Sequence, residues 1–206
     1  MAKKSFKKKR KQLLQEFAKE NIHNAVLELI GEKGVQDLTV ANVAKKAGIA
    51  KGTIYLYFED KEDLICSTIE TSLQPLFSHH LEILESDIPP NEKLVEYATF
   101  SMEFFDKYRS TFRALLYNQH QVHVHKERYI DDKYQQIRDH LTDVIWDGVN
   151  QGIFRDIDPF IGANIFMEST IAVTVQYLIT ETKRDIDEDV SSLIDILLNG
   201  LNQIKS

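Results

Sequence analysis

A short segment, residues 39–61 (TVANVAKKAGIAKGTIYLYFEDK), holds the side chains best spaced to bind a nucleic acid. Small or apolar residues at Val40, Val43 and Ala47 recur at the spacing of one helix face. Gly48 adopts a left-handed backbone at little cost and is predicted to end this helix. A second short helix follows. Two helices about a glycine turn form a helix-turn-helix, whose second helix can enter the major groove of DNA.

In the second helix, Ile54 and Phe58 lie four residues apart and are predicted to face inward. Lysine and hydroxyl groups bind phosphate oxygens and base edges. The residues left to face outward are Lys51, Thr53, Tyr55 and Tyr57. The two tyrosines have an alternative, which is packing against the helix that precedes the motif. We favour contact with DNA for Tyr55 and leave both alternatives open for Tyr57.

The composition is that of a soluble globular protein. Of 206 residues, 43% are hydrophobic and 28% are charged, which allows one or two domains with a sizeable core. No apolar run is long enough to span a membrane, and the charged N-terminus lacks the apolar segment of a signal peptide, so we expect a cytoplasmic protein. A single cysteine, Cys66, excludes an internal disulfide.

Charge is divided unevenly along the chain. Residues 1–61 hold 13 Lys or Arg and 7 Asp or Glu, whereas residues 62–206 hold 12 and 25. The first part can attract phosphates and the second repels them. We therefore predict a DNA-binding domain over residues 1–61 and a second domain over residues 62–206. Seven basic residues and no acid within residues 1–11 are either a solvated tail or an arm that lies on DNA.

Helices are predicted along the whole chain, because apolar residues recur at helical spacing and no alternating strand pattern occurs. The apolar stripe of residues 13–30 predicts a first helix over about residues 11–33. A fourth helix begins near Asp60, and Pro75 is expected to bend or end it. The remaining helices are expected over about residues 76–85, 91–106, 108–120, 126–151, 159–180 and 188–204. The predicted fold is all-α, with a three-helix head and a larger helical body.

The head resembles the DNA-binding domain of the TetR family of transcriptional regulators. The resemblance covers about the first third of the chain and rests on Ala47-Gly48, Gly52-Thr53-x-Tyr55-x-Tyr57-Phe58 and Lys61-Glu62-x-Leu64, in that order. It implies a homodimer that pairs through the last two helices, here residues 159–180 and 188–204. Most members repress transcription from a palindromic operator. A small effector that binds the body moves the fourth helix and releases the DNA.

The resemblance also implies contacts position by position. Thr39 and Lys61 are expected at phosphates, with Thr39 also capping its helix. Family members often carry Ser where this chain has Ala50, which can instead touch a thymine methyl group. The predicted DNA contacts are Thr39, Ala50, Lys51, Gly52, Thr53, Tyr55, Tyr57 and Lys61.

The body is rich in aromatic residues, several of which cover more than one face of a helix. Most are expected in the core, yet helices that are apolar on several faces can line a cavity. We therefore predict a small hydrophobic effector, such as a long-chain acyl compound or an aromatic drug. The predicted lining is Phe100, Phe104, Phe105, Phe112, Tyr129, Trp146 and Phe166.

Two other classes of function have less support. An all-helical ligand-binding enzyme is disfavoured because no nucleophile–base pair, phosphate-binding glycine loop or metal motif is found. A DNA-binding protein without an effector would not need an acidic, aromatic-rich body. His120, His123 and His125 form a cluster, but no carboxylate or thiol stands at an adjacent turn. We predict no catalytic residue, cofactor or metal.

Overall fold

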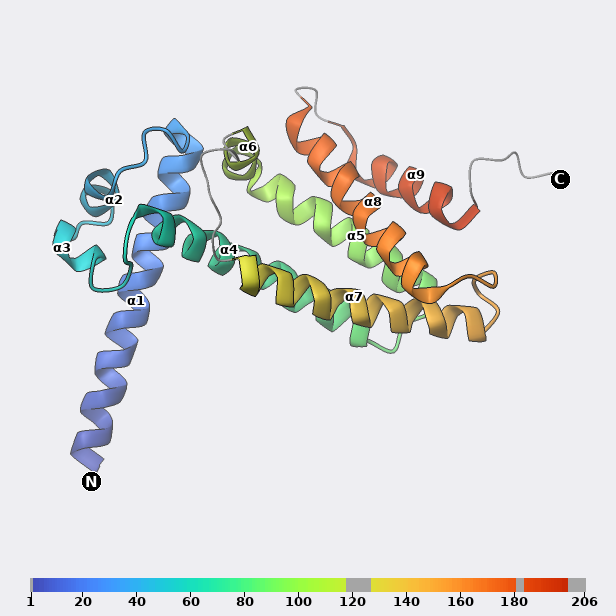
Figure 1. Cartoon of the computed structure of the whole chain (residues 1–206), viewed down its shortest axis with the longest axis horizontal. Coiled ribbons are helices and arrows are strands. Elements are labelled where there is room, and N and C mark those ends of the chain that lie inside the picture. The colour runs from blue at the N-terminus through green and yellow to red at the C-terminus, as the bar shows by residue number, and fades with distance from the viewer. Residues whose placement is uncertain (1, 118–126, 181–183, 200–206) are drawn as a thin grey trace. The chain divides into compact units, whose positions relative to one another are not determined.

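The computed structural model describes residues 2–117, 127–180 and 184–199. Within these ranges the chain forms nine helices and no strand (Figure 1), which confirms the all-α prediction. The described residues form two compact units. Unit 1 contains residues 2–72 and 110–117, and unit 2 contains residues 73–109, 127–180 and 184–199. The division therefore falls inside helices that continue from one unit into the other.

Helix α1 (Ala2–Lys33) starts at the beginning of the described chain, not near residue 11 as expected. Residues 2–30 contain neither Gly nor Pro and are rich in good helix formers, so nothing stops the helix from extending. The basic segment is thus helical. Only the second half of the apolar stripe is covered: Ile22 and Val26 are 0% exposed, whereas Phe17 is 62% exposed.

Unit 1 is built around the buried face of α1. Against it pack α2 (Val40–Lys46), α3 (Lys51–Ile54) and the first half of α4 (Lys61–Glu85). Residues of α6 (Arg109–Tyr117) pack against the same core through Ala114 and Leu115. The fully buried members of this core include Ile22, Val26, Ile30, Leu38, Val43, Ile54 and Leu64.

Helix α4 runs for 25 residues and contains Pro75 in its interior. Pro75 was expected to bend or end this helix; it does not end it, and the prediction of a separate helix over residues 76–85 is wrong. Pro75 is exposed, so the carbonyl that loses its N–H partner at the preceding turn can be hydrated, and the interruption costs less than it would in a core.

Unit 2 contains α5 (Pro90–Lys107), α7 (Glu127–Asn150), α8 (Pro159–Ile179) and α9 (Ile186–Asn199). Helices α7 and α8 approach closely, since a Cβ at Gly162 of α8 would lie 3.1 Å from Ile145 of α7. A Cβ at Gly148 of α7 would lie 2.1 Å from the ring of Phe154, in the connection between the two helices. Asp158 accepts a hydrogen bond from the backbone N–H of Ile161 at 3.1 Å and caps α8, which begins at Pro159 as predicted.

The C-terminal end of α8 is held by side chains from the end of α5 and the start of α6. The guanidinium of Arg109 donates to the backbone carbonyls of Tyr177 and Thr180, each at 2.7 Å. The hydroxyl of Tyr177 donates to Asp106 at 2.8 Å. The two bonds from Arg109 satisfy carbonyls that the end of a helix leaves without an internal partner.

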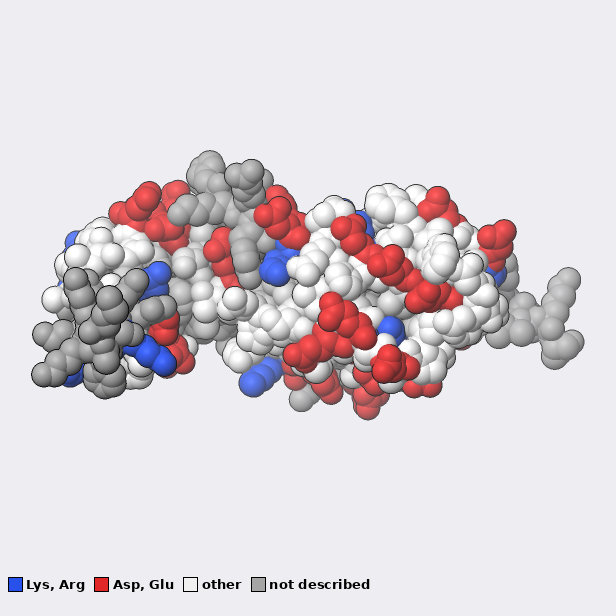
Figure 2. Space-filling view, turned by 90° about the horizontal axis from the view of Figure 1, so that it is seen from below, with Lys and Arg blue, Asp and Glu red and all other residues white. Residues whose placement is uncertain are grey.

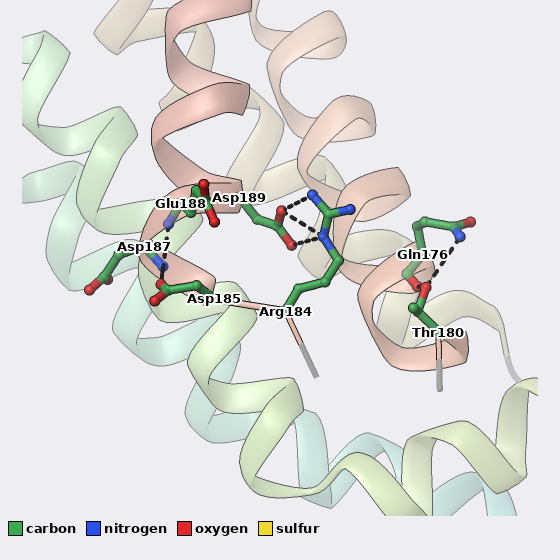
Figure 3. Close-up of polar contacts among 7 residues, drawn as sticks. All are labelled: Gln176, Thr180, Arg184, Asp185, Asp187, Glu188 and Asp189. Carbon is green, nitrogen blue, oxygen red and sulfur yellow. Dashed lines mark hydrogen bonds and ion pairs between the residues drawn. The ribbon is translucent and has the colours of Figure 1, made fainter. Parts of the chain in front are cut away.

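The start of α9 is organised by acidic side chains (Figure 3). Asp185 accepts from the backbone N–H groups of Asp187 and Glu188 at 2.9 and 3.3 Å. Asp189 is only 7% exposed and is paired with the guanidinium of Arg184. The paired Arg184 neutralises this buried carboxylate. The acidic side chains at the N-terminus interact favourably with the helix dipole and so stabilise the helix.

Candidate nucleic-acid interface and aromatic interior

The turn between α2 and α3 has the geometry that the sequence predicts. The hydroxyl of Thr39 accepts from the backbone N–H of Asn42 at 3.1 Å and caps α2. Gly48 has a φ of 68°, a backbone conformation that residues other than glycine adopt only with strain. The backbone N–H of Ile49 then donates to the carbonyl of Ala44 at 3.0 Å. The two short helices are therefore fixed at a defined angle by local bonds.

Helix α3 buries one face and exposes the other. Ile54 is 1% exposed and Phe58 is 4% exposed, which confirms both as core residues. Tyr55 is 50% exposed, so it does not pack in the core of unit 1. The ammonium of Lys51 lies 5.9 Å from the centre of the Tyr55 ring, where the two can attract each other.

The other positions predicted to contact DNA surround this exposed face of α3. Ala50 and Gly52 are exposed, and a Cβ at Gly52 would meet no atom within 4 Å. Thr53 is partly exposed. Tyr57 is half-buried against the core, with its ring 6.4 Å from that of Phe58. The face thus presents hydroxyl, ammonium and small apolar groups on an open surface, while Tyr57 has a packing role as well.

Lys61 is the first residue of α4, and two carboxylates fix the helix start around it. Asp60 accepts from the backbone N–H of Asp63, and Asp63 accepts from that of Glu59, both at 2.8 Å. Asp60 thus caps the first turn, and Asp63 binds the backbone of the residue that precedes the cap. The ammonium of Lys61 lies 3.5 Å from the carbonyl oxygen of Val35, a long contact that leaves donors free for another acceptor.

A histidine lies where α1 passes α4 inside unit 1. His23 is 7% exposed, its Nε2 lies 3.4 Å from the hydroxyl of Ser67, and its ring is 5.5 Å from Phe58. Burial, helped by the charge of Lys19, lowers the pKa of His23 to about 4. The imidazole is therefore neutral near pH 7 and acts as a core residue.

Sequence reasoning missed two exposed residues next to the predicted contacts. Leu56 is 76% exposed on the turn after α3, and Lys45 is exposed in the last turn of α2. The signal for Leu56 was its position two residues after Ile54, which turns it away from the buried face. Lys46 is engaged instead, with its ammonium 2.9 Å from Glu28 and 2.7 Å from Glu32.

The predicted effector-lining residues fall into several places. Phe104 and Phe166 are buried in unit 2, at 7% and 3% exposure, and Phe100 and Phe105 are half-buried on the same helix as Phe104. The ring of Phe104 lies 6.2 Å from that of Phe100 and 5.5 Å from that of Phe105. These four form the aromatic interior of unit 2 together with Tyr97, whose ring is 5.5 Å from Phe166.

The other three lie elsewhere. Trp146 is 58% exposed on α7 and lies on the surface rather than in the interior, because its helix turns the neighbouring Ile145 inward at 4% exposure. Phe112 is buried, but it belongs to unit 1. Tyr129 is part of α7, and its side chain lies outside the described residues. We leave these three out of the aromatic interior.

The aromatic interior also contains polar groups that sequence reasoning did not connect. The Nε2 atom of His80 lies 2.9 Å from the hydroxyl of Ser101, and burial lowers the pKa of this histidine to about 3. Burial raises the pKa of both Tyr97 and Tyr134, so their phenols stay protonated. The signal was present: His80 occupies the apolar face of α4 together with Leu76 and Leu84.

The described residues contain no group of three or more side chains placed to hold a metal ion. His120, His123 and His125 lie outside the described residues. Within the described ranges, no helix combines the length and hydrophobicity needed to cross a membrane. On the face shown in Figure 2, acidic side chains predominate over unit 2, in line with the charge division seen along the chain.

A capped pair of short helices about a positive-φ glycine, with an exposed second helix, defines a helix-turn-helix DNA-binding protein. Two family models match the chain. The model of bacterial regulatory proteins of the tetR family covers residues 22–67, and the model of the tetracyclin repressor-like C-terminal domain covers residues 87–177. The chain belongs to the TetR family of transcriptional regulators.

Relatives and solved structures agree with this assignment. The HTH-type transcriptional repressor KstR2 of Rhodococcus jostii (strain RHA1) is 29% identical over 177 residues, which are 84% of this chain and 85% of the relative. The fatty acid metabolism regulator protein of Bacillus subtilis (strain 168) is 23% identical over 184 residues, 88% of this chain and 94% of the relative. Both relatives are regulators by name, as the family assignment implies.

The fold is shared with solved structures. The transcriptional regulator FadR from Bacillus subtilis, determined in complex with stearoyl-CoA, superposes with a TM-score of 0.76 at 20% identity and covers 89% of this chain and 99% of its own. The fatty acid degradation regulator FadR from Bacillus halodurans superposes with a TM-score of 0.75 at 22% identity, covering 89% and 96%.

Proposed function

We propose that this protein is a transcriptional repressor that binds a palindromic operator as a homodimer and is released by a long-chain acyl effector. The observation that carries the DNA-binding part is the exposed face of α3, where Lys51 and Tyr55 project from a helix fixed on its other side by Ile54 and Phe58. The proposed contacts are Thr39, Ala50, Lys51, Gly52, Thr53, Tyr55, Tyr57 and Lys61.

The homodimer is proposed to form through α8 and α9, because both helices leave apolar residues uncovered in the single chain. Ile161 and Ile165 lie one turn apart on α8 and are each 53% exposed, and Ile196 on α9 is 47% exposed. Apolar residues that share an exposed helix face mark association surfaces. To bind the two halves of a palindrome, the α3 helices of such a dimer must reach successive major grooves, about 34–36 Å apart or somewhat more.

The effector class is proposed from the aromatic interior of unit 2 and from the relatives. Tyr97, Phe104 and Phe166 are buried, and ring contacts join Tyr97 to Phe166 and Phe104 to Phe100 and Phe105. An interior of aromatic rings suits an alkyl chain better than a polar metabolite. Two similar proteins are regulators of fatty acid metabolism or degradation. The FadR structure from Bacillus subtilis holds stearoyl-CoA. These facts favour an acyl compound over an aromatic drug.

The experiment has two stages. Selection of bound duplexes from a random pool at moderate salt is expected to enrich one palindromic sequence; a pool without a preferred site contradicts the repressor proposal. Stearoyl-CoA is then added to the complex with that duplex, and fluorescence anisotropy follows its release. Release by stearoyl-CoA but not by coenzyme A supports the acyl effector, and an unchanged complex contradicts it.

A further inference from the structure

His80 on α4 is a buried polar residue enclosed by aromatic rings. It is 3% exposed. Its imidazole stacks on Tyr97 with ring centres 3.8 Å apart and an angle of 21° between the planes, and Phe100 meets it edge-on at 6.0 Å. A buried polar side chain rarely lies among aromatic rings unless its polar atoms form hydrogen bonds.

The hydrogen bonds of Ser101 fix which nitrogen of His80 carries the proton. The hydroxyl of Ser101 donates to the backbone carbonyl of Tyr97 at 2.8 Å. A hydroxyl has one proton, so the Ser101 oxygen can only accept in its second contact, the one at 2.9 Å to Nε2 of His80. Nε2 therefore carries the proton, and Nδ1 of the neutral ring is a bare acceptor.

This acceptor has no partner in the described part of the chain. Nδ1 of His80 is among the buried side-chain atoms without a hydrogen bond. Burial lowers the pKa of His80 to about 3. The ring therefore stays neutral near pH 7, and Nδ1 remains a hydrogen-bond acceptor. A buried acceptor without a donor is costly, and native proteins satisfy more than about 90% of buried polar groups. We therefore expect Nδ1 to accept a hydrogen bond from an O–H or N–H group of another molecule.

We propose that Nδ1 of His80 is the polar anchor of the effector site and selects apolar molecules that carry a hydrogen-bond donor. The inference rests on the proposed function and names the chemistry of its ligand. The rings of Tyr97 and Phe100 receive the apolar chain, and Nδ1 accepts from a hydroxyl or an amide N–H. A carboxylate offers only acceptors, so a free fatty acid is rejected, whereas the amide groups of an acyl-pantetheine satisfy the site.

The test compares four ligands with the same ten-carbon chain: decan-1-ol, N-decylacetamide, decyl methyl ether and decanoate. Isothermal titration calorimetry on the full-length protein is expected to show that at least one donor, alcohol or amide, binds about tenfold or more tightly than the ether and decanoate. Tighter binding of the alcohol indicates that the natural donor is a hydroxyl group, and tighter binding of the amide indicates an amide N–H, as in an acyl-pantetheine. Equal binding of the ether overturns the proposal.

Two variants locate the effect. His80→Phe keeps an aromatic ring but removes Nδ1, so its affinities for the preferred donor and for the ether are expected to converge. His79→Phe is the matched control, because His79 is the adjacent histidine, is partly exposed and already has its Nδ1 3.0 Å from Glu82. His79→Phe is expected to keep the tenfold preference. Loss of the preference in both variants, or in neither, contradicts the assignment.

A measurement on the unmodified protein guards against a folding defect in His80→Phe. In ¹⁵N spectra, Nδ1 of His80 is expected as an unprotonated ring nitrogen whose resonance moves upfield when the preferred donor is added. An unmoved resonance in the presence of bound ligand overturns the proposal.

The proposed function and this inference fail in different ways. If long-chain acyl compounds release the operator while the alcohol, amide and ether bind equally, only the anchor is wrong. If none of these compounds binds and stearoyl-CoA does not release the operator, the proposed effector class is wrong as well.

Discussion

At the scale of single residues, Tyr55 is the clearest case in which exposure separates two roles. Half of its surface is exposed, while Ile54 before it is buried. We expect Tyr55→Ala to leave the fold intact and to lower operator affinity by about 1–3 kcal/mol, the range of one base or backbone contact of good geometry. Circular dichroism checks the fold and fluorescence anisotropy checks the affinity. Unfolding of the head in this variant would assign Tyr55 to the core.

Lys61 and Lys46 form a matched pair of lysines. Lys46 is paired with Glu28 and Glu32, while Lys61 has a single long contact to a carbonyl. We expect Lys61→Ala to weaken binding to all DNA sequences and to reduce the slope of log affinity against log salt by about 1, because the variant neutralises one phosphate fewer. Lys46→Ala is expected to leave that slope unchanged. Equal slopes for Lys61→Ala and the wild type would remove Lys61 from the contacts.

His23 makes the stability of the head depend on pH. Its pKa is lowered to about 4 in the folded protein, from an ordinary value of 6.5. The unfolded chain therefore binds the proton more readily, and the stability held above pH 6.5 is lost as the pH falls from about 6.5 towards 4. We expect His23→Gln to show a shallower loss over this interval in urea titrations. Parallel curves for variant and wild type would contradict a neutral buried His23.

At the scale of elements, α1 raises the question of what its basic end does. The helix continues through a segment with seven Lys or Arg and ends in unit 1 as a core helix. We expect deletion of residues 2–11 to lower affinity for any duplex and to reduce the salt slope by about 0.9 for each phosphate that this end neutralises. The melting temperature of the head should change little, because the fully buried positions begin at Ile22. An unchanged slope would show that this end does not lie on DNA.

The helix boundaries show which parts of the fold sequence reasoning can predict. Local chemistry decided α2 and α8, where Thr39 and Asp158 cap the first turn, and those starts were predicted correctly. The end of α4 was predicted wrongly because an exposed Pro75 interrupts one bond and leaves the rest of the helix packed. The start of α1 was also wrong, since like charges in a row do not prevent a helix of good helix formers.

The candidate site was predictable only where a motif fixes it. The exposed and buried faces of α3 follow from the four-residue spacing of Ile54 and Phe58. The effector lining does not, because an aromatic residue looks the same in the sequence whether its helix turns it inward, as for Phe166, or outward, as for Trp146. His80 was overlooked for a related reason: its partner Ser101 lies on another helix.

At the scale of the whole molecule, the proposed dimer depends on the exposed apolar face of α8. We expect Ile165→Glu to convert the dimer into a monomer, because two like charges would be buried opposite each other near a twofold axis. Light scattering after size exclusion measures the mass, and operator affinity should fall with it. Gln151→Glu adds the same charge at an exposed position outside α8 and α9 and should stay dimeric. A dimeric Ile165→Glu would place the interface elsewhere.

The exposed Trp146 has a practical consequence for the search for the effector. It is the sole tryptophan of the chain, and 58% of its surface is exposed on α7. Indole emission responds to the surroundings of the ring itself, and these are unlike the interior around Tyr97 and Phe166. A compound that fills this interior would leave the fluorescence spectrum nearly unchanged. Screens of compound collections by intrinsic fluorescence would therefore miss true effectors, and heat-denaturation or calorimetric screens would find them.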